Sequence, residues 1–163
     1  MSDLRVHKTK YINETKRVSF KYDGKNYFGY EGDTLASALL ANGVHLIGRS
    51  FKYHRPRGIM SCGSEEPNAI CQISDKNDLT EPNVRATELE IYDGLEAFSQ
   101  NCWPNVKFDI GGINNLISPL IPAGFYYKTF MWPKSFWKKV YEPLIRMSAG
   151  LGKSPTEPDP DIY

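Results

Sequence analysis

Residues 17–43 have the sequence RVSFKYDGKNYFGYEGDTLASALLANG. Apolar and polar residues alternate from Val18 to Tyr22, which is the period-two pattern of a half-buried strand. Asp23-Gly24 then supplies a tight turn, because glycine tolerates a positive φ, and a second β-rich run follows it. The first half of this stretch therefore predicts a β-hairpin over residues 17–30.

The second half of the stretch predicts a helix. Asp33 is placed to cap it, and Thr34–Ala41 consists of good helix formers apart from Ser37. Asn42-Gly43 is the pair that tolerates the left-handed conformation expected at a helix C-terminus. After the helix, the apolar residues of Val44–Ile47 predict a short buried strand.

Two more strands are expected further along the chain, at Ala69–Ile73 and Thr87–Tyr92, with a polar connection over residues 74–82. A hairpin, a helix and two further strands within about 90 residues is the element order of a β-grasp, in which one helix lies across a small mixed sheet. Plant-type ferredoxins use this fold and hold their cluster in the loop after the helix. We therefore predict an α+β, ferredoxin-like domain over residues 17–100, preceded by an N-terminal extension over residues 1–16.

The chain changes character after residue 100. Residues 101–124 are turn-rich and irregular but strongly apolar, and Phe125–Trp132 holds five aromatic residues in eight. A helix is expected after Pro133, kinked or divided by Pro143. We predict that residues 101–152 form a helical, aromatic-rich arm that docks on a partner, with packing on the sheet as the alternative. Residues 153–163 have the composition of a semi-extended linker.

The loop after the predicted helix is strongly cationic. Gly48–Gly58 contains four permanent cations and no acid, namely Arg49, Lys52, Arg55 and Arg57. Guanidinium groups in a stiff loop predict binding of a phosphate, a carboxylate or a partner surface. One alternative is a solvated basic turn whose charge offsets Glu65 and Glu66. The other is an RNA-binding module, which the chain's net charge of +1 disfavours.

The three cysteines, Cys62, Cys71 and Cys102, lack the C-x4-C-x2-C spacing of plant-type clusters. We therefore expect no metal and structural thiols, and a free-standing electron carrier remains only an alternative. No other metal-ligand spacing, dinucleotide-binding glycine motif or nucleophile elbow is present, so we expect no catalytic residue. The odd cysteine count and the polar N-terminus indicate a reducing cytoplasm.

Several long blocks of the chain resemble the start of the alpha subunit of heterotetrameric sarcosine oxidases. They are Gly32–Gly43, Gly48–Gly58, Gly63–Ala69, Pro122–Pro133, Tyr141–Arg146 and Ala149–Gly152. The resemblance implies a complex of four different subunits that demethylates sarcosine with oxygen to glycine and hydrogen peroxide. It also implies transfer of the one-carbon unit to tetrahydrofolate, with NAD, FAD and FMN bound in the complete complex.

The same resemblance implies a role for this part of the subunit. In the family, the alpha subunit continues into a domain that holds NAD and then into a folate-binding domain, and its opening domain resembles a 2Fe–2S β-grasp without the cluster. No catalytic position of the family matches a residue here, and the chain ends before the dinucleotide-binding part. We expect an excised or separately encoded docking domain whose partners are the rest of the alpha subunit and the other subunits, with no nucleic acid and no membrane.

Overall fold

The computed structural model describes residues 4–5, 9–74, 80–120, 132–149, 152 and 154–155. Its centre is a mixed sheet with the strand order β2-β1-β7-β5-β6. The strands are β1 (Asn13–Tyr22), β2 (Lys25–Glu31), β5 (Ile70–Ser74), β6 (Thr80–Arg85) and β7 (Glu96–Ser99). Strands β1 and β7 are parallel, and the other neighbours are antiparallel. The predicted α+β class is confirmed.

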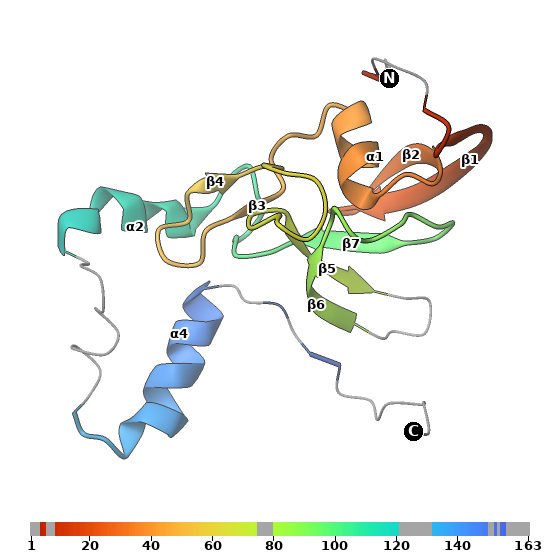
Figure 1. The fold of residues 1–163 in the computed structure, drawn as a ribbon. Coiled ribbons are helices and arrows are strands. Elements are labelled where there is room, and N and C mark those ends of the chain that lie inside the picture. Colours follow the sequence, from red (N-terminus) through yellow and green to blue (C-terminus); the bar gives the residue numbers. More distant parts are fainter. Residues whose placement is uncertain are drawn as a thin grey trace.

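The helix α1 (Leu35–Ala41) lies across one face of this sheet (Figure 1). Its side chains Leu35 and Leu39 belong to the same buried cluster as Phe20 of β1 and Leu95, which precedes β7. Full burial of such a side chain stabilises the fold by about 2 kcal/mol relative to exposure. The core therefore lies between α1 and the sheet, which is the arrangement that the β-grasp prediction requires.

The predicted hairpin is confirmed. Strands β1 and β2 pair on either side of a turn in which Asp23 has a φ of 47° and Gly24 a φ of 73°. Both angles are positive, as in the two-residue turns that match the twist of a hairpin. The Asp23 carboxylate also accepts hydrogen bonds from the backbone N–H and the hydroxyl of Ser99, which tie the turn to β7. Strand β1 begins at Asn13, earlier than the predicted Arg17, with an irregular register between them.

The predicted cap of α1 is wrong by one residue. Thr34 is the N-cap, and its side chain accepts a hydrogen bond from the backbone N–H of Ser37 at 3.2 Å. Asp33 is instead fully buried. Its carboxylate pairs with the guanidinium of Arg5 at 2.9 Å and also accepts hydrogen bonds from the Tyr30 backbone and the Ser37 hydroxyl. The carboxylate of Asp33 is therefore bonded to Arg5, a partner from elsewhere in the sequence, and does not cap α1.

The end of α1 agrees with the prediction, whereas the strand predicted after it is absent. Asn42 is the C-cap, and Gly43 has a φ of 74°. The segment Val44–Ile47 forms no strand, although Ile47 is fully buried. Ile47 donates its N–H to the Arg57 carbonyl at 2.8 Å and accepts a hydrogen bond from the Tyr22 hydroxyl at 2.5 Å. The burial of Ile47 therefore explains why an apolar residue stands at this position, although the residue belongs to no strand.

The strand predicted at Ala69–Ile73 is confirmed as β5, but the strand predicted at Thr87–Tyr92 is wrong. In this segment only Glu90 forms an isolated bridge, to Thr34. Its backbone instead bonds the start of α1, because Leu35 donates its N–H to the Leu89 carbonyl at 2.8 Å. The alternation correctly marked residues that face the core, but the strands lie elsewhere. Strand β6 overlaps the predicted polar connection at residues 80–82, and β7 was not predicted.

The segment after β7 forms short helical turns rather than an irregular chain. They are η1 (Ile110–Gly112), α2 (Ile113–Leu116) and η2 (Ser118–Leu120). Beyond them, the π-helical turn η3 (Trp137–Tyr141) leads directly into α4 (Glu142–Ala149). The helix expected after Pro133 is therefore present and changes from π-helical to α-helical geometry at Glu142, whereas the kink or division expected at Pro143 stays a prediction. The aromatic residues 125–131 and most of the predicted linker lie outside the described residues.

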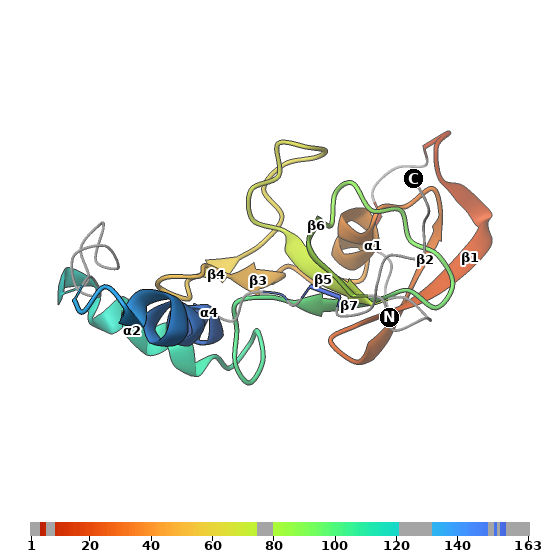
Figure 2. The same cartoon turned by 90° about the horizontal axis from the view of Figure 1, so that it is seen from below.

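A two-stranded ladder of β3 (Gly48–Arg49) and β4 (Pro56–Arg57) lies between the sheet and the segments that carry α2 and α4 (Figures 1 and 2). The cationic loop predicted from the sequence is the connection of this ladder. Among the described residues, no helix is long and apolar enough to cross a membrane.

The buried pair of Arg5 and Asp33 generates a first prediction. Removing the guanidinium by Arg5→Ala leaves a carboxylate that is fully buried without its cation, and we expect a loss of about 3 kcal/mol in the free energy of unfolding. Lys16→Ala is the matched control, since it removes a cation from the exposed pair with Glu31. Urea unfolding of both variants is the measurement, and equal midpoints for the two would contradict the prediction.

Candidate functional site

Strands β3 and β4 pair as a tight hairpin, and the cationic loop connects them. Within it, Ser50 donates its N–H to the Arg55 carbonyl at 3.0 Å and accepts the N–H of His54 at 2.8 Å. His54 adopts a φ of 52°, a left-handed value that closes the turn. The side chains of the cationic loop therefore project from a short stretch of backbone that these two hydrogen bonds hold in place.

Arg49 points into the protein. Its guanidinium donates to three backbone carbonyls, those of His54 at 3.0 Å, Val106 at 2.9 Å and Lys107 at 3.2 Å. These contacts join the cationic loop to the segment that follows β7. Because three of its five N–H donors bond carbonyls of two segments, Arg49 links those segments.

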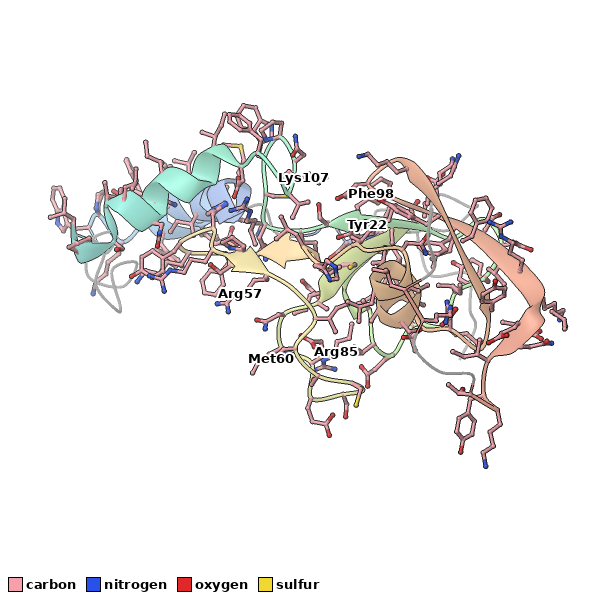
Figure 3. The ribbon with its side chains drawn as sticks, turned by 90° about the horizontal axis from the view of Figure 1, so that it is seen from above. Tyr22, Arg57, Met60, Arg85, Phe98 and Lys107 are labelled. Atoms are coloured by element: carbon pink, nitrogen blue, oxygen red, sulfur yellow. The ribbon has the colours of Figure 1, made fainter. Side chains whose placement is uncertain are left out.

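The other three predicted cations lie toward the surface. The ammonium of Lys52 and the guanidinium of Arg55 both lie over the ring of Tyr53, each 4.8 Å from its centroid. Arg55 also donates to the side-chain oxygen of Asn115 at 2.9 Å, so this cation is next to α2. Arg57 is exposed on β4 (Figure 3), and within the described ranges its guanidinium makes no hydrogen bond or ion pair. That these residues bind an anion or a partner stays a prediction.

His54 and Asp109 form a buried pair that could not be recognised from the sequence, because the two residues are far apart in the chain. The His54 Nδ1 lies 2.7 Å from a carboxylate oxygen of Asp109, and both side chains are almost completely buried. The other carboxylate oxygen accepts the N–H groups of Trp103 and Gly111. A Cβ on Gly111 would lie 2.3 Å from the His54 ring, so only glycine permits this approach. The pair fastens the start of η1 to the cationic loop.

Glu66 is the second buried acid of this region, with an exposed fraction of 1%. One carboxylate oxygen accepts the N–H groups of Met60 and Ser61, both at 2.7 Å. The other accepts those of Asn68 at 2.7 Å and Ala69 at 3.1 Å. Burial by itself raises the pKa of Glu66, but these four hydrogen bonds outweigh it and hold the pKa below its ordinary value. The carboxylate of Glu66 is therefore held by the backbone of its own loop, and the solvated basic turn stays an alternative for the cationic loop.

The three cysteines have different environments. Cys71 on β5 is fully buried, and burial raises the pKa of its thiol to about 12. Cys102 is half-buried, and burial also raises its pKa. These two fit the expected role of structural thiols, whereas Cys62 is exposed. The expectation was therefore wrong for Cys62, because it lies in a surface loop outside the core.

A groove with a volume of about 960 Å³ opens beside the hairpin turn. The rings of Tyr22 and Tyr27 line it together with His45, Asp23 and Lys107, and Figure 3 labels Tyr22 and Lys107. Its charged groups are of both signs. The groove therefore favours no anionic ligand, and the candidate site remains the region from Gly48 to Ala69 with the segment that Arg49 and His54 contact.

The Glu66 hydrogen bonds generate a second prediction. In Glu66→Gln, the side-chain amide presents an NH2 group to two N–H donors that lose their acceptor, and we expect a loss of about 3 kcal/mol in the free energy of unfolding. The matched control is Glu65→Gln, which changes the exposed neighbour. Chemical unfolding measures both, and a Glu66→Gln variant as stable as the control would refute the prediction.

The lowered pKa of Glu66 gives a third prediction, on pH. A depressed folded-state pKa contributes stability that is complete above the unfolded-state value of about 4.3 and is lost as the pH falls through the folded-state value. The stability gap between the unmodified chain and Glu66→Gln should therefore be constant near neutral pH and narrow below about pH 4.3. Thermal unfolding from pH 3 to 7 is the measurement, and a gap that widens on acidification would be the opposite result.

Comparison with known proteins identifies the relatives of the chain. It is 57% identical over all of its residues to the N-terminal region of "Sarcosine oxidase subunit alpha" of Rhizobium meliloti (strain 1021), of which it spans 16%. It is 41% identical over 88 residues to the protein of the same name from Corynebacterium sp. (strain U-96), covering 53% of this chain and 9% of that protein. The resemblance to sarcosine oxidase alpha subunits is confirmed.

A solved structure, L-proline dehydrogenase from P. horikoshii, matches with a TM-score of 0.42 and 22% identity over 58% of this chain and 17% of that one. Residues 15–102 match a family described as a 2Fe-2S iron-sulfur cluster binding domain. Plant-type clusters of this kind need four cysteine thiolates, whereas this chain has three cysteines, one of them buried in the core as a thiol of raised pKa.

Nowhere in the described part of the chain do three histidine, cysteine, aspartate or glutamate side chains come together as metal ligands. The residues present therefore do not fit the cluster. By its match over residues 15–102, the chain belongs to the family of 2Fe-2S iron-sulfur cluster binding domains, although its own side chains do not supply the ligands of such a cluster.

Proposed function

We propose that the chain is a non-catalytic docking domain of a sarcosine oxidase alpha subunit. On this proposal it belongs to a cytoplasmic complex that oxidatively demethylates sarcosine to glycine and hydrogen peroxide and passes the one-carbon unit to tetrahydrofolate. The NAD, FAD and FMN of that complex lie outside this chain. The identity of 57% over the whole chain to a protein of that name supports the assignment.

The observation that carries the docking role is the exposure of apolar side chains on residues 103–120 and 132–147, which we call the apolar arm. Its largest exposed residues are Trp103, Phe108, Leu116, Leu120, Trp132 and Met147, each more than 60% exposed. Leaving apolar surface in water costs about 25 cal/mol per Å². Exposed apolar patches of this kind are typical of surfaces that a partner covers.

The remainder of the alpha subunit is the partner that we propose for the apolar arm. The chain spans 16% of the length of its Rhizobium relative, so most of that polypeptide lies outside the part that matches. Arg55 borders the arm, since its guanidinium donates to the side chain of Asn115 in α2, and Arg57 follows two residues later on β4. An apolar surface edged by acidic groups would therefore complement both features.

A fourth prediction tests the apolar arm. The triple variant Leu116→Ser, Leu120→Ser and Met147→Ser should weaken binding to the separately expressed remainder of the alpha subunit at least tenfold, because central apolar contacts carry most binding energy. Met60→Ser is the control, since Met60 is 75% exposed but lies outside the arm. Co-purification and calorimetric titration are the measurements. Full binding by the triple variant would remove the basis for the docking proposal.

A fifth prediction separates the roles of the cations. Arg55→Ala with Arg57→Ala should lower the affinity for the remainder of the alpha subunit and flatten its salt dependence, with only a small change in melting temperature, because the contacts of Arg55 are exposed. Arg49→Ala should lower the melting temperature, because three carbonyls lose their donor. Melting curves and titrations at low and high salt distinguish the two effects. Unchanged affinity at low salt in the double variant would exclude a docking role for Arg55 and Arg57.

A further inference from the structure

The edge strand β6 carries a bulge where it pairs with β5. The register of the two strands shifts there, so that two residues of β6, Pro82 and Asn83, stand opposite Gln72 alone. Asn83 has a φ of 63°, a left-handed value that bulges use. A bulge turns backbone groups out of the regular ladder. Here the N–H of Asn83 donates to the side-chain oxygen of Gln100 at 3.3 Å.

Gln100 connects this bulge to the apolar arm. It comes directly after β7 and before the arm, and its exposed fraction is only 4%. Its side-chain oxygen is bonded to Asn83, but its buried side-chain nitrogen has no hydrogen-bond partner among the residues that the structure describes. Leaving a buried N–H donor without an acceptor costs stability. The surroundings of this nitrogen therefore need an explanation.

A glycine from beyond α4 lies against that nitrogen. A Cβ on Gly152 would clash with the side-chain nitrogen of Gln100. It would also lie 2.6 Å from the Cβ of Pro82 and 2.7 Å from the side-chain oxygen of Gln72. The two amide groups end flexible side chains that can turn away, but the Pro82 Cβ belongs to a ring on a paired strand. Only glycine therefore fits here without a shift of β6.

This contact lies on the face of the sheet away from α1. Cys71 and Ala97 belong to the core cluster under α1, so Gln72 and Gln100, an odd number of residues further along, point to the opposite face. In Figure 1 the blue residues that follow α4 lie below β5, on the side away from α1. The chain beyond α4 therefore returns to the sheet from which the apolar arm departs.

We propose that Gln72, Pro82 and Gln100 form a seat for Gly152, which closes the apolar arm into a lobe whose two ends meet at Gln100. The seat takes peptide backbone without a side chain, because amide groups line it and a Cβ does not fit. An arm held at both ends loses less conformational freedom when a partner binds it. The seat is a contact within the chain, so it stands or fails independently of the docking role.

Nuclear magnetic resonance of the full 163-residue chain tests the seat directly. The short approach of Gly152 to Pro82 brings the α-protons of the glycine near the β-protons of the proline. We expect nuclear Overhauser cross-peaks between these protons, and between the Gly152 α-protons and the side-chain NH2 of Gln100. Assigned resonances of Gly152 that show neither cross-peak would overturn the proposal.

A second test measures how firmly the seat holds the chain. Lys153 follows Gly152, so trypsin cleavage after Lys153 reports release of this segment. In Gly152→Ala the added methyl group displaces the segment, and we expect this cleavage to become at least several-fold faster. Gly112→Ala is the matched control, because a Cβ there meets no atom within 4 Å. A peptide of residues 149–157, with and without the substitution, corrects for any effect on trypsin itself.

A double variant then shows whether the two sides of the seat act together. Gln100→Ala should also speed cleavage after Lys153, and adding Gly152→Ala should speed it no further, because each change opens the same contact. Cleavage after Lys21 in β1 reports global unfolding and should not rise in proportion. Effects that multiply in the double variant, or equal cleavage of Gly152→Ala and Gly112→Ala, would contradict the seat.

Discussion

The carboxylate of Glu66 closes the loop that joins the cationic ladder to the sheet. Without it, four backbone N–H groups would face each other across a buried space, with no acceptor between them. The loop must close there because Ala69 leads directly into β5, which lies in the sheet between β7 and β6. A single charged side chain thus sets the path of the chain from the surface into the core.

Two other buried carboxylates also hold separate segments together, and they accept hydrogen bonds from different donors. Asp33 receives a guanidinium and connects the N-terminal segment to the start of α1. Asp109 receives an imidazole and two backbone N–H groups, and it connects the first helical turn of the arm to the cationic loop. Each acid joins segments that are far apart in the sequence. Buried carboxylates in this protein therefore fix the relative placement of the segments that they join.

The sequence was informative wherever local chemistry decides the structure. The alternation around Phe20 and the Asp23-Gly24 turn predicted the hairpin, and the run to Asn42-Gly43 predicted the helix and its end. Prediction from the sequence failed where a contact with a distant residue decides the structure. The alternation of Leu89 and Ile91 marked inward-facing residues correctly, but the sheet partner that would make them a strand is absent, because the segment bonds to α1 instead.

The candidate site was predicted less completely for the same reason. The four cations were visible as a cluster, but nothing local shows that Arg49 would turn inward to carbonyls of residues 106–107. The roles of Asp33, His54 and Glu66 also depend on contacts that the fold creates. Cysteine spacing led to the expectation of no cluster, and the closed loop around Glu66 is recognisable only once the N–H groups of its two ends are located.

The position of β7 has a mechanical consequence. The apolar arm leaves the domain from this strand, which lies in the middle of the sheet between β1 and β5. The N–H of Asp23, after its parallel neighbour β1, bonds the carbonyl of Ala97 in β7, and the N–H of Lys21 bonds the carbonyl of Leu95 just before β7. A force applied to the arm would therefore load an interior strand along its length, and bonds on both of its sides would have to slide together before the strand could move. The arm is therefore attached to the strand of the sheet that resists such a force most.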